Sequence, residues 1–196
     1  MTKRLLKKSF FSLNIFLIYL FSISIALADI QKKLINKLTG TQTLSFNFKQ
    51  KISDQEEVGN CFIKYPLLMK CNYENLKEKT IISNGKTLAI IKKKYKKIYL
   101  YPIKSTPLFF ILTKEKIIDL ISKTNPTEIN SNLIGFIFVG KKTNKIKILF
   151  DKNSLEFKGW ETKDAYSNKV SFEINNLIIN NQIIDDFFKI PQEKDL

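Results

Sequence analysis

The chain has 196 residues, 44% of them hydrophobic, and 33 basic against 18 acidic side chains give a formal net charge of +15. It has no histidine and two cysteines. The lack of histidine removes the commonest general base, and two cysteines alone cannot form a four-ligand zinc site. We therefore expect neither an enzyme nor a metal site. The length suits one domain with a substantial core.

Residues 1–28 have the pattern of a secretory signal peptide. Basic residues without acids precede a mostly apolar run over 10–25, and the small residues Ala26 and Ala28 frame a cleavage position. We expect cleavage after Ala28, a periplasmic location and a single domain over 29–196. The alternative is an uncleaved membrane anchor, because the apolar run approaches the roughly 17–25 residues that a spanning helix needs.

The predicted mature chain begins with a short amphipathic helix. Apolar residues stand one helical step apart within residues 29–38, and Gly40 ends the pattern. From Leu44 onward the period changes to two, so that Phe46 and Phe48 share one face of a strand. A long β region is expected to start here.

The two cysteines flank a turn at residues 65–68. By alternation, Cys61 and Ile63 share one face of the incoming strand, while Cys71 and Tyr73 share one face of the outgoing strand. The two sulfurs can then lie nearly opposite each other, and thiols of exported chains tend to oxidise. We predict a Cys61–Cys71 disulfide that adds at most about 3 kcal/mol to stability. The alternative is two small buried thiols.

The rest of the chain continues the β pattern around one helical interruption. Asn84-Gly85 between two apolar runs predicts a hairpin, and Pro107 suits the first turn of one or two short helices within 106–123. The predicted strands cover residues 80–83, 86–91, 97–103, 133–139, 145–151, 154–163, 169–175 and 177–184, the last four as a meander. The sequence thus predicts a mainly antiparallel β domain with a few short helices.

An exported β domain with apolar helices in mid-chain is suited to holding an apolar ligand. Each methylene removed from water contributes about 0.8 kcal/mol, so a chain of about 16 carbons contributes roughly 10 kcal/mol or more. The alternative for each of the large apolar residues is ordinary packing in the core. The hydrophobic pattern of the sequence alone favours this alternative.

Five stretches follow one another in a recognisable order: Gly59–Tyr73, with Lys64-Tyr65-Pro66 at its turn, Ile81–Leu88, Tyr101–Leu108, Leu155–Asp164 and Asp186–Phe188. In this order and spacing they resemble the LolA family of outer-membrane lipoprotein carriers, in its alphaproteobacterial form. The first two look like successive hairpins of the family, the third is similar to its passage from strand to helix, and the last two resemble its closing meander. The resemblance implies an incomplete, half-open β-barrel closed by an α-helical lid.

The resemblance also implies a function. A periplasmic chaperone of this family binds the acyl chains of lipoproteins in an apolar cavity, and carries them from an inner-membrane ABC transporter to an outer-membrane acceptor. It implies no cofactor and no nucleic acid, and we expect a monomer. The alternatives are a carrier or sensor of free lipid on the same scaffold, a secreted hydrolase and an envelope structural protein.

The resemblance assigns candidate site residues by position. Met69 and Ile81 fall in the cavity wall, and Leu108, Phe109 and Leu112 fall in the lid. Strand alternation adds four further candidates for the wall, namely Phe46, Phe48, Ile63 and Tyr73.

Tyr65 is the main departure from the family pattern. The family often has arginine here, immediately before the hairpin proline, where it bonds lid carbonyls and holds the empty cavity shut. A tyrosine hydroxyl donates one hydrogen bond, worth about 1 kcal/mol net, whereas arginine offers several charge-assisted ones. We treat Tyr65 as a candidate latch. Cys71 likewise stands where the family commonly has tryptophan.

Overall fold

The computed structural model describes residues 29–74, 78–140, 145–164 and 167–196. The predicted signal peptide at 1–28 lies outside the described residues. Residues 29–39 are helical and confirm the predicted amphipathic helix. The backbone N–H of Gly40 donates to the carbonyl of Asn36 at 3.2 Å, where the helix ends.

The strands of the first half are β1 (Thr43–Ile52), β2 (Gln55–Lys64), β3 (Leu68–Tyr73), β4 (Lys79–Asn84), β5 (Thr87–Lys92) and β6 (Lys97–Pro102). The helices α2 (Leu108–Ile111) and α3 (Lys114–Lys123) follow, where helices were predicted. The second half contains β7 (Thr127–Glu128), β8 (Leu133–Val139), β9 (Lys145–Asp151), β10 (Phe157–Lys163) and β11 (Lys169–Ile179).

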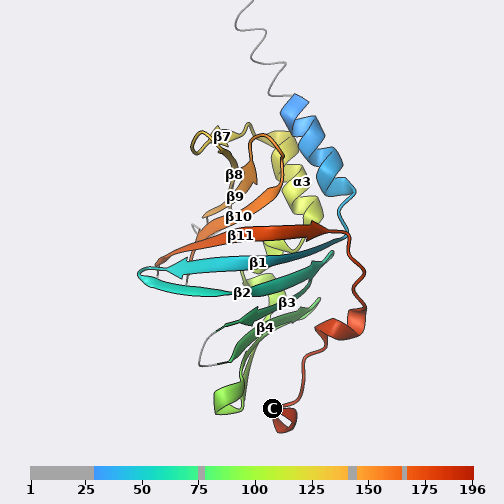
Figure 1. Cartoon of the computed structure of the whole chain (residues 1–196), viewed down its shortest axis with the longest axis vertical. Helices are drawn as coiled ribbons and strands as arrows, with labels where there is room; N and C mark the ends of the chain where they lie inside the picture. Colours follow the sequence, from blue (N-terminus) through green and yellow to red (C-terminus); the bar gives the residue numbers. More distant parts are fainter. Residues whose placement is uncertain (1–28, 75–77, 141–144, 165–166) are drawn as a thin grey trace, which may run out of the picture.

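Within the described residues, all these strands belong to one antiparallel sheet of 11 strands. Its order is β6-β5-β4-β3-β2-β1-β11-β10-β9-β8-β7, so β6 and β7 are the two edges and the sheet is open (Figure 1). The first strand pairs with the last, which joins the two halves of the chain. This confirms the predicted mainly antiparallel domain with few short helices.

The predicted strand over 177–184 is wrong. Residues 169–179 form one continuous strand, β11, and β1 pairs with it on both sides of a register shift between Ser45 and Asn47. Asn176 takes a φ of 52°, a conformation that asparagine tolerates better than most residues. Asn176, which lies between the predicted strands over 169–175 and 177–184, is therefore an irregularity inside one strand.

A row of aromatic rings crosses the inner face of the sheet, the face that the helices cover. Tyr73 packs against Phe48 with ring centroids 4.8 Å apart, and Phe48 stacks on Phe172 at 4.7 Å. Phe172 in turn stacks on Trp160 at 4.0 Å with an interplanar angle of 9°. The row runs from β3 to β10 across the β1–β11 pair, and such contacts add to the burial of each ring.

The β2–β3 hairpin has the register that alternation predicted. Cys61 is paired with Cys71, and Ile63 with Met69. The structure joins the two cysteines in a disulfide with the Cα atoms 4.0 Å apart. Both cysteines are buried in the main core cluster.

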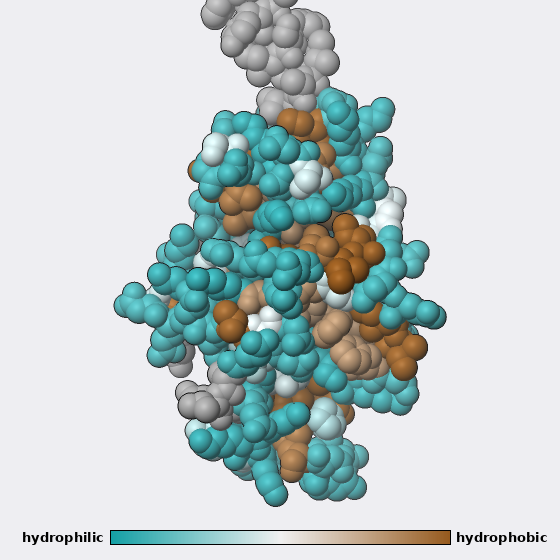
Figure 2. Space-filling model, in the orientation of Figure 1, coloured by the Kyte–Doolittle hydropathy of each residue, from teal (hydrophilic) through white to brown (hydrophobic). Residues whose placement is uncertain are grey.

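The outer face of the sheet is partly covered by the C-terminal segment that follows β11 (Figure 1). Phe187 packs edge-to-face on Phe62 of β2, with centroids 5.0 Å apart. Farther on, Ile190 and Leu196 pack against a small cluster on β4 and β5. Figure 2 shows a mostly hydrophilic surface, with hydrophobic residues gathered at the right of the view alongside this segment.

The close approach of two strands at Gly159 provides a test of the fold. Gly159 has a φ of +131°, and a Cβ atom there would lie 1.8 Å from the carbonyl oxygen of Phe172. We expect Gly159→Ala to lower the free energy of unfolding by about 1–3 kcal/mol, measured by urea denaturation. Gly40→Ala is the control, because its Cβ would meet nothing nearer than 3.7 Å. Equal unfolding free energies for the two variants would contradict this strand packing.

Candidate functional site

A cavity of about 340 Å³ lies between the inner face of the sheet and the start of α2. We call it the inner cavity. Its volume is within the range of about 300–1,000 Å³ that is usual for ligand sites. Both halves of the chain contribute to its apolar lining, which consists of Ile52, Met69, Cys71, Tyr73, Ile81, Ile90, Pro107, Leu108, Trp160, Val170 and Phe172.

Polar residues line the inner cavity at one end only. They are Gln50, Lys79, Thr162, Lys163 and Asp164. Gln50 is near the end of β1, Lys79 begins β4 and Lys163 ends β10, and in an antiparallel sheet these positions fall at the same end of the strands. This is the left end of the sheet in Figure 1, where β1 turns into β2. We call these five residues the polar end.

Tyr73 connects the polar end to the aromatic row. Its hydroxyl donates to Oε1 of Gln50 at 2.6 Å, and the ammonium of Lys79 lies 3.7 Å from its ring centroid. Lys79 also forms an ion pair with Glu57 of β2. Burial, and secondarily the negative charge of Glu57, raises the pKa of Tyr73 above its usual value. The phenol therefore stays protonated at neutral pH and acts as a hydrogen-bond donor.

The structure brings four of the predicted site residues together around the inner cavity: Met69, Tyr73, Ile81 and Leu108. Phe46, Phe48 and Ile63 are buried in the same core cluster without lining the cavity. Of the other two lid candidates, Leu112 is fully buried and Phe109 is partly buried against the core.

Sequence reasoning missed the wall that β10 and β11 provide, with Trp160, Val170 and Phe172. Two-residue alternation places Val170 and Phe172 on one face of their strand. The alternation does not predict that β11 pairs with β1. This pairing places the face with Val170 and Phe172 beside the residues of the hairpin.

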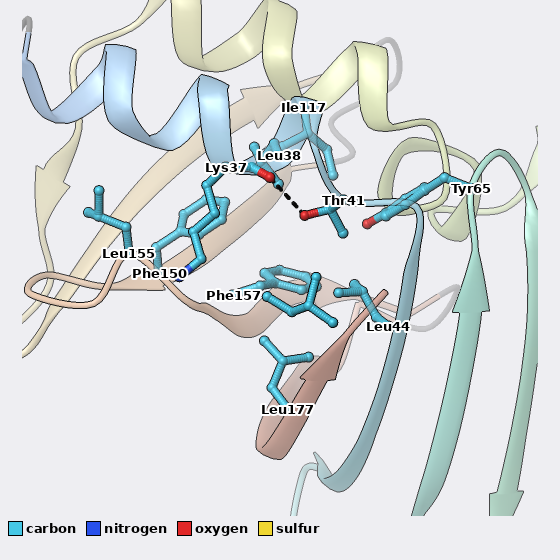
Figure 3. Close-up of a pocket in the computed structure, with 11 residues that line it drawn as sticks. Lys37, Leu38, Thr41, Leu44, Tyr65, Ile117, Phe150, Leu155, Phe157 and Leu177 are labelled. Carbon is cyan, nitrogen blue, oxygen red and sulfur yellow. Dashed lines mark hydrogen bonds between the residues drawn. The ribbon is translucent and has the colours of Figure 1, made fainter. Parts of the chain in front are cut away.

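A second, much smaller cavity of about 20 Å³ lies where the helix over 29–39 meets the sheet (Figure 3). This is the space of roughly one water molecule. Tyr65 lines it together with Leu38, Leu44 and Ile117. The cavity is too small for an acyl chain, so the inner cavity is the candidate functional site.

Tyr65 is partly buried against the core, and desolvation raises the pKa of its hydroxyl, with a further contribution from the charge of Glu115. Among the described residues, no hydrogen bond runs from this hydroxyl to a lid carbonyl. The hairpin instead contacts the lid region through its backbone, because the N–H of Leu67 donates to the carbonyl of Leu112 at 2.9 Å. The hydroxyl latch at Tyr65 stays a prediction.

The helix over 29–39 and α3 lie side by side (Figure 1), and a side chain of each bonds the C-terminal end of the other. Lys114 donates to the carbonyls of Thr39 and Thr41 at 3.1 and 2.8 Å. Gln31 donates to the carbonyls of Ile121 and Thr124 at 2.9 and 2.7 Å. These carbonyls lie at or just beyond the ends of the helices, where they lack partners within their own helix. The Lys114 ammonium also lies 5.9 Å from the Tyr65 ring centroid.

Two features are absent from the part of the chain that the structure describes. No group of three or more His, Cys, Asp or Glu side chains is placed to hold a metal ion. No helix there is both long enough and apolar enough to cross a membrane.

An open antiparallel sheet with helices on its inner face and an apolar cavity between them is an architecture suited to binding a ligand. Residues 39–191 match the family described as outer membrane lipoprotein carrier protein LolA. The chain therefore belongs to the LolA family, whose members are periplasmic binding and carrier proteins, and the resemblance seen in the sequence is confirmed. A comparison with curated proteins gives no match.

Solved structures similar to this chain share little sequence with it. A LolA superfamily protein from Nitrosomonas europaea is 8% identical, with a TM-score of 0.46, and the alignment covers 84% of this chain and 97% of that one. LprF from Mycobacterium bovis is 8% identical, with a TM-score of 0.48 and coverages of 85% and 97%. An uncharacterized conserved protein from Thermus thermophilus is 6% identical, with a TM-score of 0.50 and coverages of 84% and 94%. This last likeness concerns the fold alone.

The bonds from Lys114 generate a prediction about how the helices are held. Lys114→Met removes two charge-assisted bonds to helix-end carbonyls, so we expect the amides over 29–39 to exchange their hydrogens about tenfold faster. Tyr65→Phe keeps the ring beside the ammonium and should have a smaller effect.

Lys123→Met is the matched control, because it removes only an exposed ion pair with Asp119 on the same helix. If Lys114→Met exchanged no faster than this control, Lys114 would not hold the helix pair. A larger effect of Tyr65→Phe than of Lys114→Met would support the tyrosine hydroxyl as the latch.

Proposed function

We propose that this protein is a periplasmic chaperone that binds the acyl chains of lipoproteins in the inner cavity, and carries them from an inner-membrane ABC transporter to an outer-membrane acceptor. The observation that carries the proposal is the cavity itself, an apolar space of about 340 Å³ between the sheet and the start of α2. Membership of the LolA family supports the same function. No catalytic step and no cofactor enter the proposal.

The lining of the inner cavity suits acyl chains. Its walls are aliphatic and aromatic from Met69 on one side to Trp160 on the other. Each methylene that leaves water contributes about 0.8 kcal/mol, so binding draws its free energy from chain length rather than from specific contacts. A carrier must also release its ligand, and therefore part of the wall has to move.

We assign the moving part to α2 and α3, the predicted lid. Leu108 lines the cavity at the start of α2, and α2 has a single turn's length. Phe110 stacks on Phe138 of β8 with centroids 4.2 Å apart, and the Leu112 carbonyl accepts the N–H of Leu67. Ile111 and Leu112 are also buried in the core cluster. Opening the cavity at α2 therefore breaks these contacts and exposes part of the core, while the pairing of the strands is kept. Phe110 is a lid anchor that the sequence did not single out.

Shuttling between two membranes requires release from the first. Cleavage after Ala28 is thus a requirement of the proposed function, and the mature protein begins at Asp29. The Cys61–Cys71 disulfide fits an oxidising periplasm.

The lid assignment is tested by placing a charge on the two partly buried lid residues. We expect Leu108→Glu and Phe109→Glu to fold like the wild type, because both side chains are only partly buried. Both should lose lipoprotein capture, because Leu108→Glu puts a carboxylate into the cavity wall, where its desolvation beside acyl chains is costly, and Phe109→Glu puts one on the neighbouring residue of the lid. In cells depleted of the wild-type protein, either variant should leave lipoproteins at the inner membrane, as measured by membrane fractionation.

Leu100→Glu is the matched control, since Leu100 lies on edge strand β6 and is 61% exposed. It should restore lipoprotein sorting in the same depleted cells. Normal transfer by both well-folded lid variants would count against the lid. Unaltered sorting on depletion itself would overturn the carrier function.

A further inference from the structure

We propose that the polar end of the inner cavity binds the ester carbonyl groups that join acyl chains to glycerol, with Gln50 and Lys79 as the hydrogen-bond donors. The inference rests on the proposed binding of acyl chains. It adds which part of the ligand is recognised and which residues recognise it.

Gln50 presents a donor that the protein does not use. The Tyr73 hydroxyl donates to Oε1 of Gln50 at 2.6 Å, which fixes the orientation of the amide. The amide nitrogen, Nε2, carries two further donors, and among the described residues it has no hydrogen-bond acceptor. Because Gln50 lines the cavity, an acceptor atom on a bound ligand would accept a hydrogen bond from Nε2.

Lys79 provides the second donor. Its ammonium has three N–H groups; one contact is the carboxylate of Glu57 and another is the ring face of Tyr73. The side chain is only 18% exposed, so few water molecules reach it. The contacts with Glu57 and Tyr73 hold the ammonium at the cavity wall, where its remaining N–H can meet a ligand.

The charges at this end favour a neutral acceptor. Lys79 pairs with Glu57, and Lys163 and Asp164 carry opposite charges, so these groups have no net charge. An added carboxylate or phosphate at Lys79 would lie close to the Glu57 carboxylate and be repelled by it. Ester carbonyls accept hydrogen bonds without carrying charge. The neutral pair therefore suits an ester better than a free fatty acid.

The position of the donors sets the direction of the ligand. Gln50 and Lys79 lie near the strand ends beside the exposed Lys163, whereas Met69 lies at the start of β3, toward the other end of the strands. Acyl chains thus run inward from the strand ends toward Met69 and cross the aromatic row, with the glycerol at the end of the sheet. Both a diacylated lipoprotein and a free glycerolipid have this arrangement of chains and esters.

The test compares two lipids that differ only in their carbonyls. The affinity of the mature protein is measured for a fluorescent diacylglycerol lipid and for its dialkyl ether analogue of equal chain length. The wild type should prefer the ester by about fivefold for each hydrogen bond made. Gln50→Leu should lower the ratio of ester to ether affinity by about fivefold, while the bond from Lys79 remains. Because both lipids are measured on the same variant, the ratio cancels any change that the loss of the Tyr73–Gln50 bond makes to the cavity itself.

Gln182→Leu is the control, because this residue lies away from the inner cavity, in the segment that follows β11; it should keep the preference. Equal affinity of the wild type for ester and ether would overturn the inference while the proposed function stands. So would an ester preference that Gln50→Leu does not reduce. Failure to bind either lipid would instead overturn the proposed function. A diacylated lipopeptide and a phospholipid are then compared as competitors of the fluorescent lipid. The competitor that binds more tightly identifies whether the recognised ester belongs to a lipoprotein or to a free lipid.

Discussion

The antiparallel pairing of β1 with β11 is the contact on which the rest of the molecule depends. It runs from Leu44 opposite Ile179 to Ile52 opposite Val170. Without this pairing the chain would contain two separate sheets, β1–β6 and β7–β11, each with an additional unpaired edge. With it, the aromatic row from Tyr73 to Trp160 becomes continuous, and Phe48 and Phe172 stack across the junction.

The inner cavity follows from that junction. One wall comes from the hairpin strands, with Met69 and Ile81, and the other from β10 and β11, with Trp160 and Val170. The same junction brings the strand ends that carry Gln50 and Lys163 to one place, so the apolar space has a single polar end. Family membership, cavity and polar end all agree with a carrier of acylated molecules.

Local chemistry explains what the sequence could predict. The alternation of Phe46 and Phe48, the Asn84-Gly85 turn, Pro107 before the helices and the spacing of Cys61 and Cys71 each act within a few residues, and the structure has the corresponding strands, turn, helices and hairpin register. A family resemblance added the lid residues that pattern alone would have assigned to the core.

Contacts between residues far apart in the chain could not be predicted from the sequence. Alternation indicates which face of a strand a side chain takes, but not which strand lies beside it. The β1–β11 pairing, the bond from Leu67 to Leu112 and the position of Trp160 are of this kind.

The most direct test of the central claim is mass spectrometry of the ligand extracted from protein purified from the periplasm. Our account predicts acylated protein, and free lipid without acylated protein would contradict it.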